Sequence, residues 1–183
     1  MTESALHVYV GKLNGAPETE MVILVSKDFA VAYACDNKQA AALVGGKVTA
    51  GSSTLNNQGG SKAVLTFDPK GARGMFSFPG KAAEGFVGVL ATGKAGFYVA
   101  DIATKRGLLA GRWVVDANGR SFGVLRLNGV IVGNPAIAPA IAFDSAVLHP
   151  VLTTVVVGYP QNPIYPTSPT YPVTLAHPSS NPY

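Results

Sequence analysis

Cysteine is nearly absent from this chain, since Cys35 is the single one among 183 residues. One cysteine excludes an intramolecular disulfide, so the fold cannot be that of a small disulfide-stabilised domain. Cys35 ends the apolar segment 31–35, VAYAC, which has the composition of a strand. We therefore expect it to be a buried small side chain rather than a reactive thiol.

Charge and long apolar runs are also scarce. Charged residues make up 13% of the chain, against a usual share of about 25%. No uninterrupted apolar run reaches the roughly 18 residues of a membrane-spanning helix, so we predict no transmembrane segment. The first residues, MTESALHVYV, lack the basic and long apolar regions of a classical signal peptide.

The charges that exist are unevenly distributed. All 14 Lys and Arg and nine of the 10 acidic residues precede Leu127, which leaves a formal charge of +5 before that residue and −1 after it. The basic residues before Leu127 are scattered, and a dense basic face of the kind that binds nucleic acid is not visible. We therefore predict no nucleic-acid partner and place a boundary near residue 133.

Two segments resemble catalytic motifs, but the residues around them do not fit the structures that those motifs need. Residues 119–123, GRSFG, fit the nucleophile elbow G-x-S-x-G, but a helix must follow the serine, and only four residues separate the motif from the Asn128-Gly129 turn. Residues 88–94 resemble a phosphate loop, but Ala95 stands where Ser or Thr should bind magnesium, and a strand pattern follows. An enzyme with Ser121 as nucleophile is therefore a minor alternative.

Metal and acid–base chemistry have no candidate either. His7, His149 and His177 are isolated from one another, and none has the spacing of metal ligands. Glu18 and Glu20 would share one face of a strand, where we expect a solvated edge. The sequence thus predicts no catalytic residue, no cofactor and no metal site, and we interpret the chain as a protein without enzymatic activity.

Residues 5–133 have the pattern of short strands separated by turns. The apolar run 21–25 suits a strand that is covered on both faces, residues 39–43 resemble a single helical turn, and the polar segment 51–60 resembles a loop. Asn14-Gly15, residues 116–119 and Asn128-Gly129 are turn signals. The pattern predicts an all-β domain, a small antiparallel barrel or sandwich. Its strands are expected at 7–10, 21–25, 29–35, 45–48, 63–67, 75–78, 85–90, 96–100, 108–115, 122–127 and 130–132.

Four segments in this region resemble a known pattern. HVYVGKLNG at 7–15, VAYACD at 31–36, GFY at 96–98 and GRWVVD at 111–116 occur in that order. They are similar to a β-rich domain of actinobacterial envelope or secreted proteins, with its "Y-x-G", "AY-x-CD", "AGLY" and "GW-x-V" elements. The resemblance covers residues 7–123 and brings no catalytic residues with it. Arg112 departs from it, because it separates Gly111 from Trp113.

Residues 134–183, the C-terminal arm, have a different composition. Residues 151–157, VLTTVVV, have high β propensity on both faces and need cover on both. Such a strand could be the last strand of its own domain, or it could add to a sheet in a neighbouring subunit.

The end of the arm is a hexad repeat. From Tyr159 the chain reads YPQNPI, YPTSPT, YPVTLA and HPSSNP, so Tyr159, Tyr165 and Tyr171 recur every six residues, each followed by proline. Polyproline II has three residues per turn, so these tyrosines would form one stripe on an extended Pro-rich arm. A flexible tail is the alternative, but the repeat carries no charged side chain to keep it solvated.

These features favour a structural role. We expect a self-assembling subunit of an extracellular filament, a surface layer, or a shell or virion, whose arm docks on neighbouring copies. Extracellular or cell-surface placement is favoured. The alternative is a monomeric protein-binding module whose tail is a polyproline-II-type ligand for a groove-binding protein partner. The predicted subunit-interface residues are Val151, Val155, Val157, Tyr159, Tyr165 and Tyr171.

Overall fold

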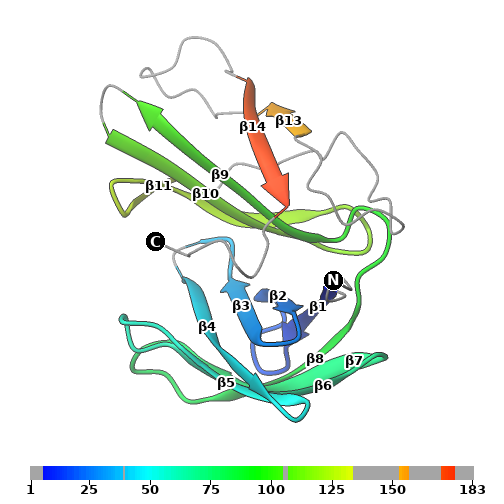
Figure 1. Cartoon of the computed structure of the whole chain (residues 1–183). Helices are drawn as coiled ribbons and strands as arrows, with labels where there is room; N and C mark the ends of the chain where they lie inside the picture. Colours follow the sequence, from blue (N-terminus) through cyan, green and yellow to red (C-terminus); the bar gives the residue numbers. More distant parts are fainter. Residues whose placement is uncertain (1–5, 39, 105–106, 134–152, 157–169, 176–183) are drawn as a thin grey trace.

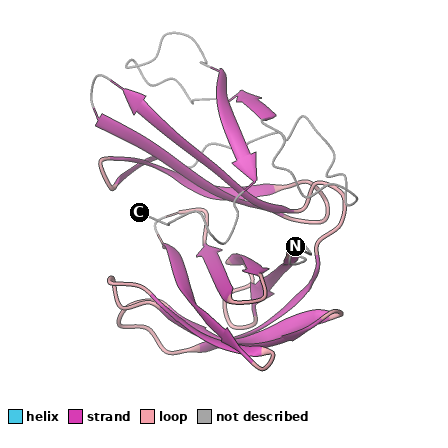
Figure 2. Cartoon of the chain, in the orientation of Figure 1, coloured by secondary structure: helices cyan, strands magenta, loops and turns pink. Residues whose placement is uncertain are grey.

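The structure, a computed structural model, describes residues 6–38, 40–104, 107–133, 153–156 and 170–175. All regular elements in these residues are strands, which confirms the predicted all-β class (Figure 2). The strands are β1 His7–Leu13, β2 Glu20–Val25, β3 Phe29–Cys35, β4 Ala41–Thr49, β5 Ser52–Asn56, β6 Lys62–Asp68, β7 Gly71–Ser77, β8 Glu84–Leu90, β9 Gly96–Thr104, β10 Gly107–Val115, β11 Ser121–Leu127, β12 Val130–Gly133, β13 Thr153–Val156 and β14 Thr170–Leu175.

Strands β1 to β8 form a closed antiparallel barrel in which sequence neighbours pair (Figure 1). The barrel closes where β1 pairs with β8, with Tyr9 opposite Leu90 and Leu13 opposite Phe86. Alternate side chains point inward and fill the interior, as the period of a strand requires. The interior core consists of Tyr9, Leu13, Met21, Ile23, Val25, Ala30, Ala32, Ala34, Ala42, Val44, Leu55, Ala63, Leu65, Ala72, Phe76 and Phe86.

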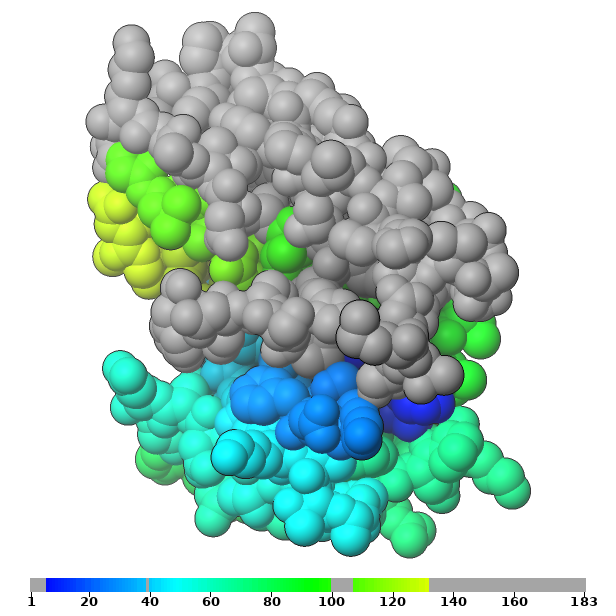
Figure 3. Space-filling view, viewed as in Figure 1, coloured from blue at the N-terminus to red at the C-terminus, as the bar shows by residue number. Residues whose placement is uncertain are grey.

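A second sheet, in the order β12-β11-β10-β9-β14-β13, packs against the outside of the barrel. Figure 3 shows barrel residues in the lower part of the molecule and residues of β9 to β12, green to yellow, above them. The second core lies between the outer face of β1–β3 and the inner face of β9–β11, where Tyr33 and Phe97 stack with ring centroids 5.0 Å apart. Its members are Val8, Val10, Val22, Leu24, Tyr33, Cys35, Ala95, Phe97, Val114 and Val124.

Hydrogen bonds between described residues join the two layers. The Tyr33 hydroxyl donates to the Arg112 carbonyl at 3.1 Å, and the Gly123 N–H donates to Asn37 Oδ1 at 3.1 Å. Arg126 Nη2 donates to the Ala41 carbonyl at 3.1 Å. The predicted barrel is therefore present, and a second sheet is attached to its wall.

Because it has a core on each side, β2 is buried at every position, from Glu20 to Val25. Strand β3 is buried from Ala30 to Cys35. The prediction that residues 21–25 are covered on both faces is confirmed, and so is the burial of Cys35, which is 0% exposed.

Two local predictions are wrong. Residues 41–43 are not helical, because they begin β4 and pair with β3, with Ala42 inside the barrel. Residues 52–56 are not a loop but form β5, whose Ser53 and Leu55 are buried while Thr54 faces outward. In both places the pairing that closes the barrel overrides a weak local preference.

Two of the three predicted turns, at residues 116–119 and at Asn128-Gly129, are correct. Asn14 and Gly15 form only a bend, and the turn between β1 and β2 lies at residues 16–19, where the Thr19 N–H donates to the Ala16 carbonyl at 2.8 Å. Asn128 and Gly129 have positive φ angles of 50° and 84°, as a two-residue hairpin turn requires, and Leu127 pairs with Val130 across them. In the turn from β10 to β11, Asp116 Oδ1 accepts hydrogen bonds from the N–H groups of Asn118 and Arg120, both at 2.9 Å.

Candidate functional site

The most distinctive element of the second sheet is its C-terminal strand. β14 lies between β9 and β13 in the sheet. The edge of β9 is therefore paired with a strand from the C-terminal arm. Within the described residues its register with β9 has two positions, Thr174 opposite Val99 and Leu175 opposite Tyr98. Its register with β13 has four, from Thr153–Val173 to Val156–Thr170. In the described residues, β14 thus has register partners on both of its sides, in β9 and in β13.

The structure brings two of the predicted interface residues together. Val155 of β13 and Tyr171 of β14 are register partners. The other four, Val151, Val157, Tyr159 and Tyr165, lie outside the described residues.

The third unit of the Tyr-Pro repeat is a strand. Tyr171 and Pro172 belong to β14, and Pro172 is the register partner of Thr154. These residues are extended but paired in a sheet, so they do not form an isolated polyproline II rod. The remaining units of the repeat lie outside the described residues.

Trp113 of the second sheet is fully buried. Its register partners are Tyr98 and Gly123. Phe97 is paired with Val114 instead and faces the barrel, so Trp113 lies on the opposite face of the sheet. Leu109, Val115 and Leu125 share that face, and each is at most 1% exposed.

An exposed apolar patch lies on the side of the barrel away from the second sheet. It consists of Val64, Met75, Val87 and Val89, which are 46–61% exposed. Val64 is the register partner of Met75, and Arg73 is the register partner of Val87, so the patch is continuous over β6–β8 and has a cation beside it. Part of it borders a shallow hollow of about 340 Å³ that also includes Asp68, Lys70 and Arg73. The alternation of buried and exposed residues in β6 and β8 could have indicated these apolar side chains. That they lie together on the outer face of the barrel could be known only from the strand order.

A charged cluster sits at one end of the junction between the layers. Lys12 Nζ lies 2.7 Å from Glu20 Oε1, and the Glu20 side chain is 2% exposed. The prediction of a solvated Glu18–Glu20 edge is therefore wrong for Glu20, because the second sheet covers this part of β2. Burial raises the pKa of Glu20 above its ordinary value of 4.5, and Lys12 opposes that shift.

The neighbouring Asp116 behaves in the opposite way. Its Oδ2 lies 2.7 Å from Arg120 Nη2. Burial by itself would raise the pKa of Asp116, but the hydrogen bonds from Arg120 and Asn118 bring it below its ordinary value of 3.8. Asp116 is therefore ionised, and its carboxylate holds the β10–β11 turn through these hydrogen bonds.

The motif residues lie in strands and turns. Ser121 is the first residue of β11, so a strand rather than a helix follows it. Gly88 lies within β8, and the strand β9 begins at Gly96, just after Lys94 and Ala95. The local geometry of a nucleophile elbow or a phosphate loop is thus not formed at these positions.

Two features are absent from the described part of the chain. No group of three or more His, Cys, Asp or Glu residues there is arranged to hold a metal ion. Among the same residues, no helix has the length and apolar character needed to cross a membrane.

Comparison with known proteins finds no matching family, no matching curated sequence and no matching solved structure.

Proposed function

We propose that this chain is a structural, self-assembling subunit whose C-terminal arm docks on a neighbouring copy. The observation that carries the proposal is the position of β14 on the edge of β9. An extended segment that adds to a sheet edge makes main-chain hydrogen bonds that any copy of the same sheet can offer. The same strand can therefore complete its own sheet or that of a neighbour.

The local geometry favours exchange between copies. Within the described residues, β14 meets β9 at two register positions, Thr174 opposite Val99 and Leu175 opposite Tyr98. β13 can move together with β14, because the described residues of the two strands pair at four positions. Residues 134–152 separate β12 from β13, and 19 residues in extended form reach about 60 Å, enough to span a neighbouring subunit.

The exposed patch on β6–β8 supports the same proposal. An apolar surface of Val64, Met75, Val87 and Val89 is a candidate contact between subunits, because monomeric proteins rarely leave such groups together in water. The resemblance of residues 7–123 to an actinobacterial envelope domain fits a cell-surface or extracellular filament, surface layer or shell.

One observation favours the second candidate, a monomeric protein-binding module. β14 pairs with β9 of its own chain here, which is the arrangement expected if the arm docks in cis. The parts of the Tyr-Pro repeat outside β14 would then be a ligand for a groove-binding protein.

A cysteine pair at one register position distinguishes the two functions. In a Cys35→Ala background, Val99→Cys and Thr174→Cys place thiols at opposed positions of β9 and β14. If the arm docks in trans, oxidation of the assembled protein gives a ladder of disulfide-linked multimers on a non-reducing gel. Intramolecular crosslinks alone, together with a monomer in size-exclusion chromatography and negative-stain microscopy, would support the module instead.

The matched control is the pair Thr66→Cys and Arg73→Cys, which are register partners within the barrel. This pair should crosslink within one chain in either case. A ladder from the control would mean that the multimers come from random collision and not from the arm.

A further inference from the structure

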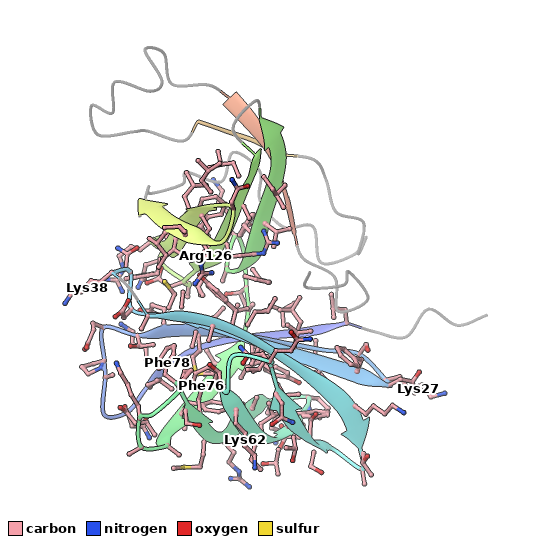
Figure 4. All side chains as sticks on the ribbon, turned by 90° about the vertical axis from the view of Figure 1, so that its left-hand side faces the viewer. Lys27, Lys38, Lys62, Phe76, Phe78 and Arg126 are labelled. Atoms are coloured by element: carbon pink, nitrogen blue, oxygen red, sulfur yellow. The ribbon has the colours of Figure 1, made fainter. Side chains whose placement is uncertain are left out.

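Two rows of outward-facing residues lie side by side on the wall of the barrel that is opposite the second sheet. In Figure 4 this wall is at the bottom, where Lys62 of β6 is labelled. Register partners in adjacent strands have their side chains on the same face of the sheet, so each row crosses β6, β7 and β8. The first row consists of Thr66, Arg73 and Val87, and the second row consists of Asp68, Gly71 and Val89.

The rows combine projecting side chains with a hollow. All of their residues except Gly71 are exposed, and Val87 and Val89, which belong to the exposed apolar patch, are 61% and 58% exposed. Gly71 has no side chain, and together with Arg73 it lines the hollow of about 340 Å³. The second row therefore leaves room at its centre for a side chain from another molecule.

The rows also carry opposite charges. Arg73 stands at the centre of the first row, and its guanidinium has five N–H donors. Asp68 is at one end of the second row, and its Oδ1 accepts hydrogen bonds from the N–H groups of Lys70 and Gly71 at 2.7 and 3.1 Å. A carboxylate has about four acceptor sites, so Asp68 can accept from a further donor. Because Asp68 borders the hollow, a cation that enters the hollow lies beside a carboxylate that the turn holds in place.

The two rows are complementary to each other when they belong to different copies of the chain. A two-fold axis that runs perpendicular to the strands, between the rows, places the first row of one copy over the second row of the other. Val87 then faces Val89 of the second copy, and Arg73 enters the hollow over Gly71 of the second copy, beside its Asp68. Because the axis is two-fold, both contacts occur twice, and each guanidinium has a carboxylate as its partner.

We propose that the outer face of β6–β8 binds the same face of a second copy, with Arg73 of each copy on Asp68 of the other. This inference rests on the proposed function, because it names a second contact through which the self-assembling subunit meets a copy of itself. With strands about 4.8 Å apart and rows about 7 Å apart, the two rows cover about 200 Å². A stable interface buries about 800 Å² per partner, so this contact is weak alone and forms in an assembly that the arms already hold together.

The test reverses the two charges in the full chain and measures assembly by sedimentation velocity. Arg73→Glu places carboxylates opposite each other, and Asp68→Lys places cations opposite each other, so each variant alone should associate at least tenfold more weakly than the wild type. When one copy of each variant meets in an equimolar mixture, every new charge faces its opposite, so the mixture should recover the wild-type profile. A profile equal to the sum of the two separate variants would overturn the proposal.

Two further variants separate this contact from other effects of charge. Lys47→Glu reverses a charge of the same sign on β4, outside both rows, and is the matched control. It should keep the wild-type profile, and it should not recover assembly when it is mixed with Asp68→Lys. Lys70 borders the hollow as a like charge to Arg73, so Lys70→Gln should strengthen the association of copies. Weaker association of Lys70→Gln, or recovery by Lys47→Glu, would also overturn the proposal.

Asp68→Asn keeps the test decisive if Asp68→Lys does not fold, because the amide oxygen can still accept the hydrogen bonds of the turn. A chain with both Arg73→Glu and Asp68→Asn should associate more strongly than Arg73→Glu alone, since one member of each like-charge pair is then neutral. Equal or weaker association of the double variant would mean that position 73 does not face Asp68 of a second copy, and the proposal would be wrong.

The cysteine pair Val99→Cys and Thr174→Cys reports on the arm separately. If that pair gives the ladder of multimers while the mixture of charge variants does not assemble, the contact through β6–β8 is wrong and the docking of the arm stands. If the mixture assembles without a ladder, the contact through β6–β8 stands and the docking of the arm on a neighbour is wrong.

Discussion

The indole ring of Trp113 packs directly against Gly111 and Gly123, where there is no room for a Cβ atom. A double-mutant cycle can test what this packing contributes to stability. Trp113 is 0% exposed. A Cβ built on Gly111 would overlap Trp113 Cη2, and the three atoms nearest to that Cβ all belong to the indole ring. A Cβ built on Gly123 would overlap Trp113 Cδ1 and also the backbone carbonyl oxygen of Arg112. The two glycines therefore differ in what excludes a side chain.

The magnitudes follow from this difference. Gly111→Ala should lower the free energy of unfolding by about 1–3 kcal/mol, the usual cost of overpacking, and Trp113→Ala by about 3–5 kcal/mol. Adding Gly111→Ala to Trp113→Ala should cost almost nothing more, because the ring that excluded the Cβ is gone. The coupling free energy is therefore expected at about 1–3 kcal/mol.

Gly123→Ala is the matched control, since the Arg112 carbonyl remains in the Trp113→Ala background. Its cost should persist when the indole is removed. Urea unfolding followed by far-UV circular dichroism measures all variants. Because Trp113 is the only tryptophan in the chain, its fluorescence also reports displacement of the ring in the glycine variants. Equal costs of Gly111→Ala with and without the indole would refute the reasoning.

Two further predictions concern the charged cluster and the exposed patch. Because the pKa of Glu20 is raised above 4.5 in the folded protein, its contribution to stability is complete below the pKa of the unfolded chain and is lost as the pH rises through the folded pKa. The melting temperature of wild type minus that of Glu20→Gln should therefore fall as the pH rises from 4.5 through the raised pKa of Glu20, and a flat or rising difference would contradict the buried placement of Glu20. Val87 and Val89 are 61% and 58% exposed, so Val87→Ser and Val89→Ser should change the free energy of unfolding by no more than about 0.5 kcal/mol. Sedimentation velocity of the double variant should shift toward smaller species, and an unchanged profile would mean that this patch is not a contact between copies.

Much of the strand order could be predicted because the local signals agree. The apolar run at 21–25 indicated cover on both faces, and the cause is that β2 borders two cores. Asn128-Gly129 indicated a two-residue turn, and the φ angles of both residues fit it.

What the sequence could not provide is pairing between distant segments. The start of β4 and the polar β5 have weak local patterns and become strands because the barrel must close. Glu20 was expected in solvent because nothing near it in the sequence shows what covers it. Its side chain is covered by the second sheet, which comes much later in the chain, and it pairs with its register partner Lys12. Arg126, which bonds to the barrel, lies in no motif of the sequence, and its partner Ala41 is 85 residues away.

The shared wall of β2 and β3 means that the two layers are not independent folding units. Removal of β9–β12 would place Val8, Val10, Val22 and Leu24 in water, so a fragment that contains the barrel strands alone should aggregate. Amide hydrogens of β2 should exchange with solvent only when the whole molecule unfolds, while those of β6 and β7 should exchange earlier through local opening. Gene fusion alone could not add or remove a second layer of this kind. A barrel without the layer would need polar side chains on the outer face of β1–β3, where the present chain has apolar ones.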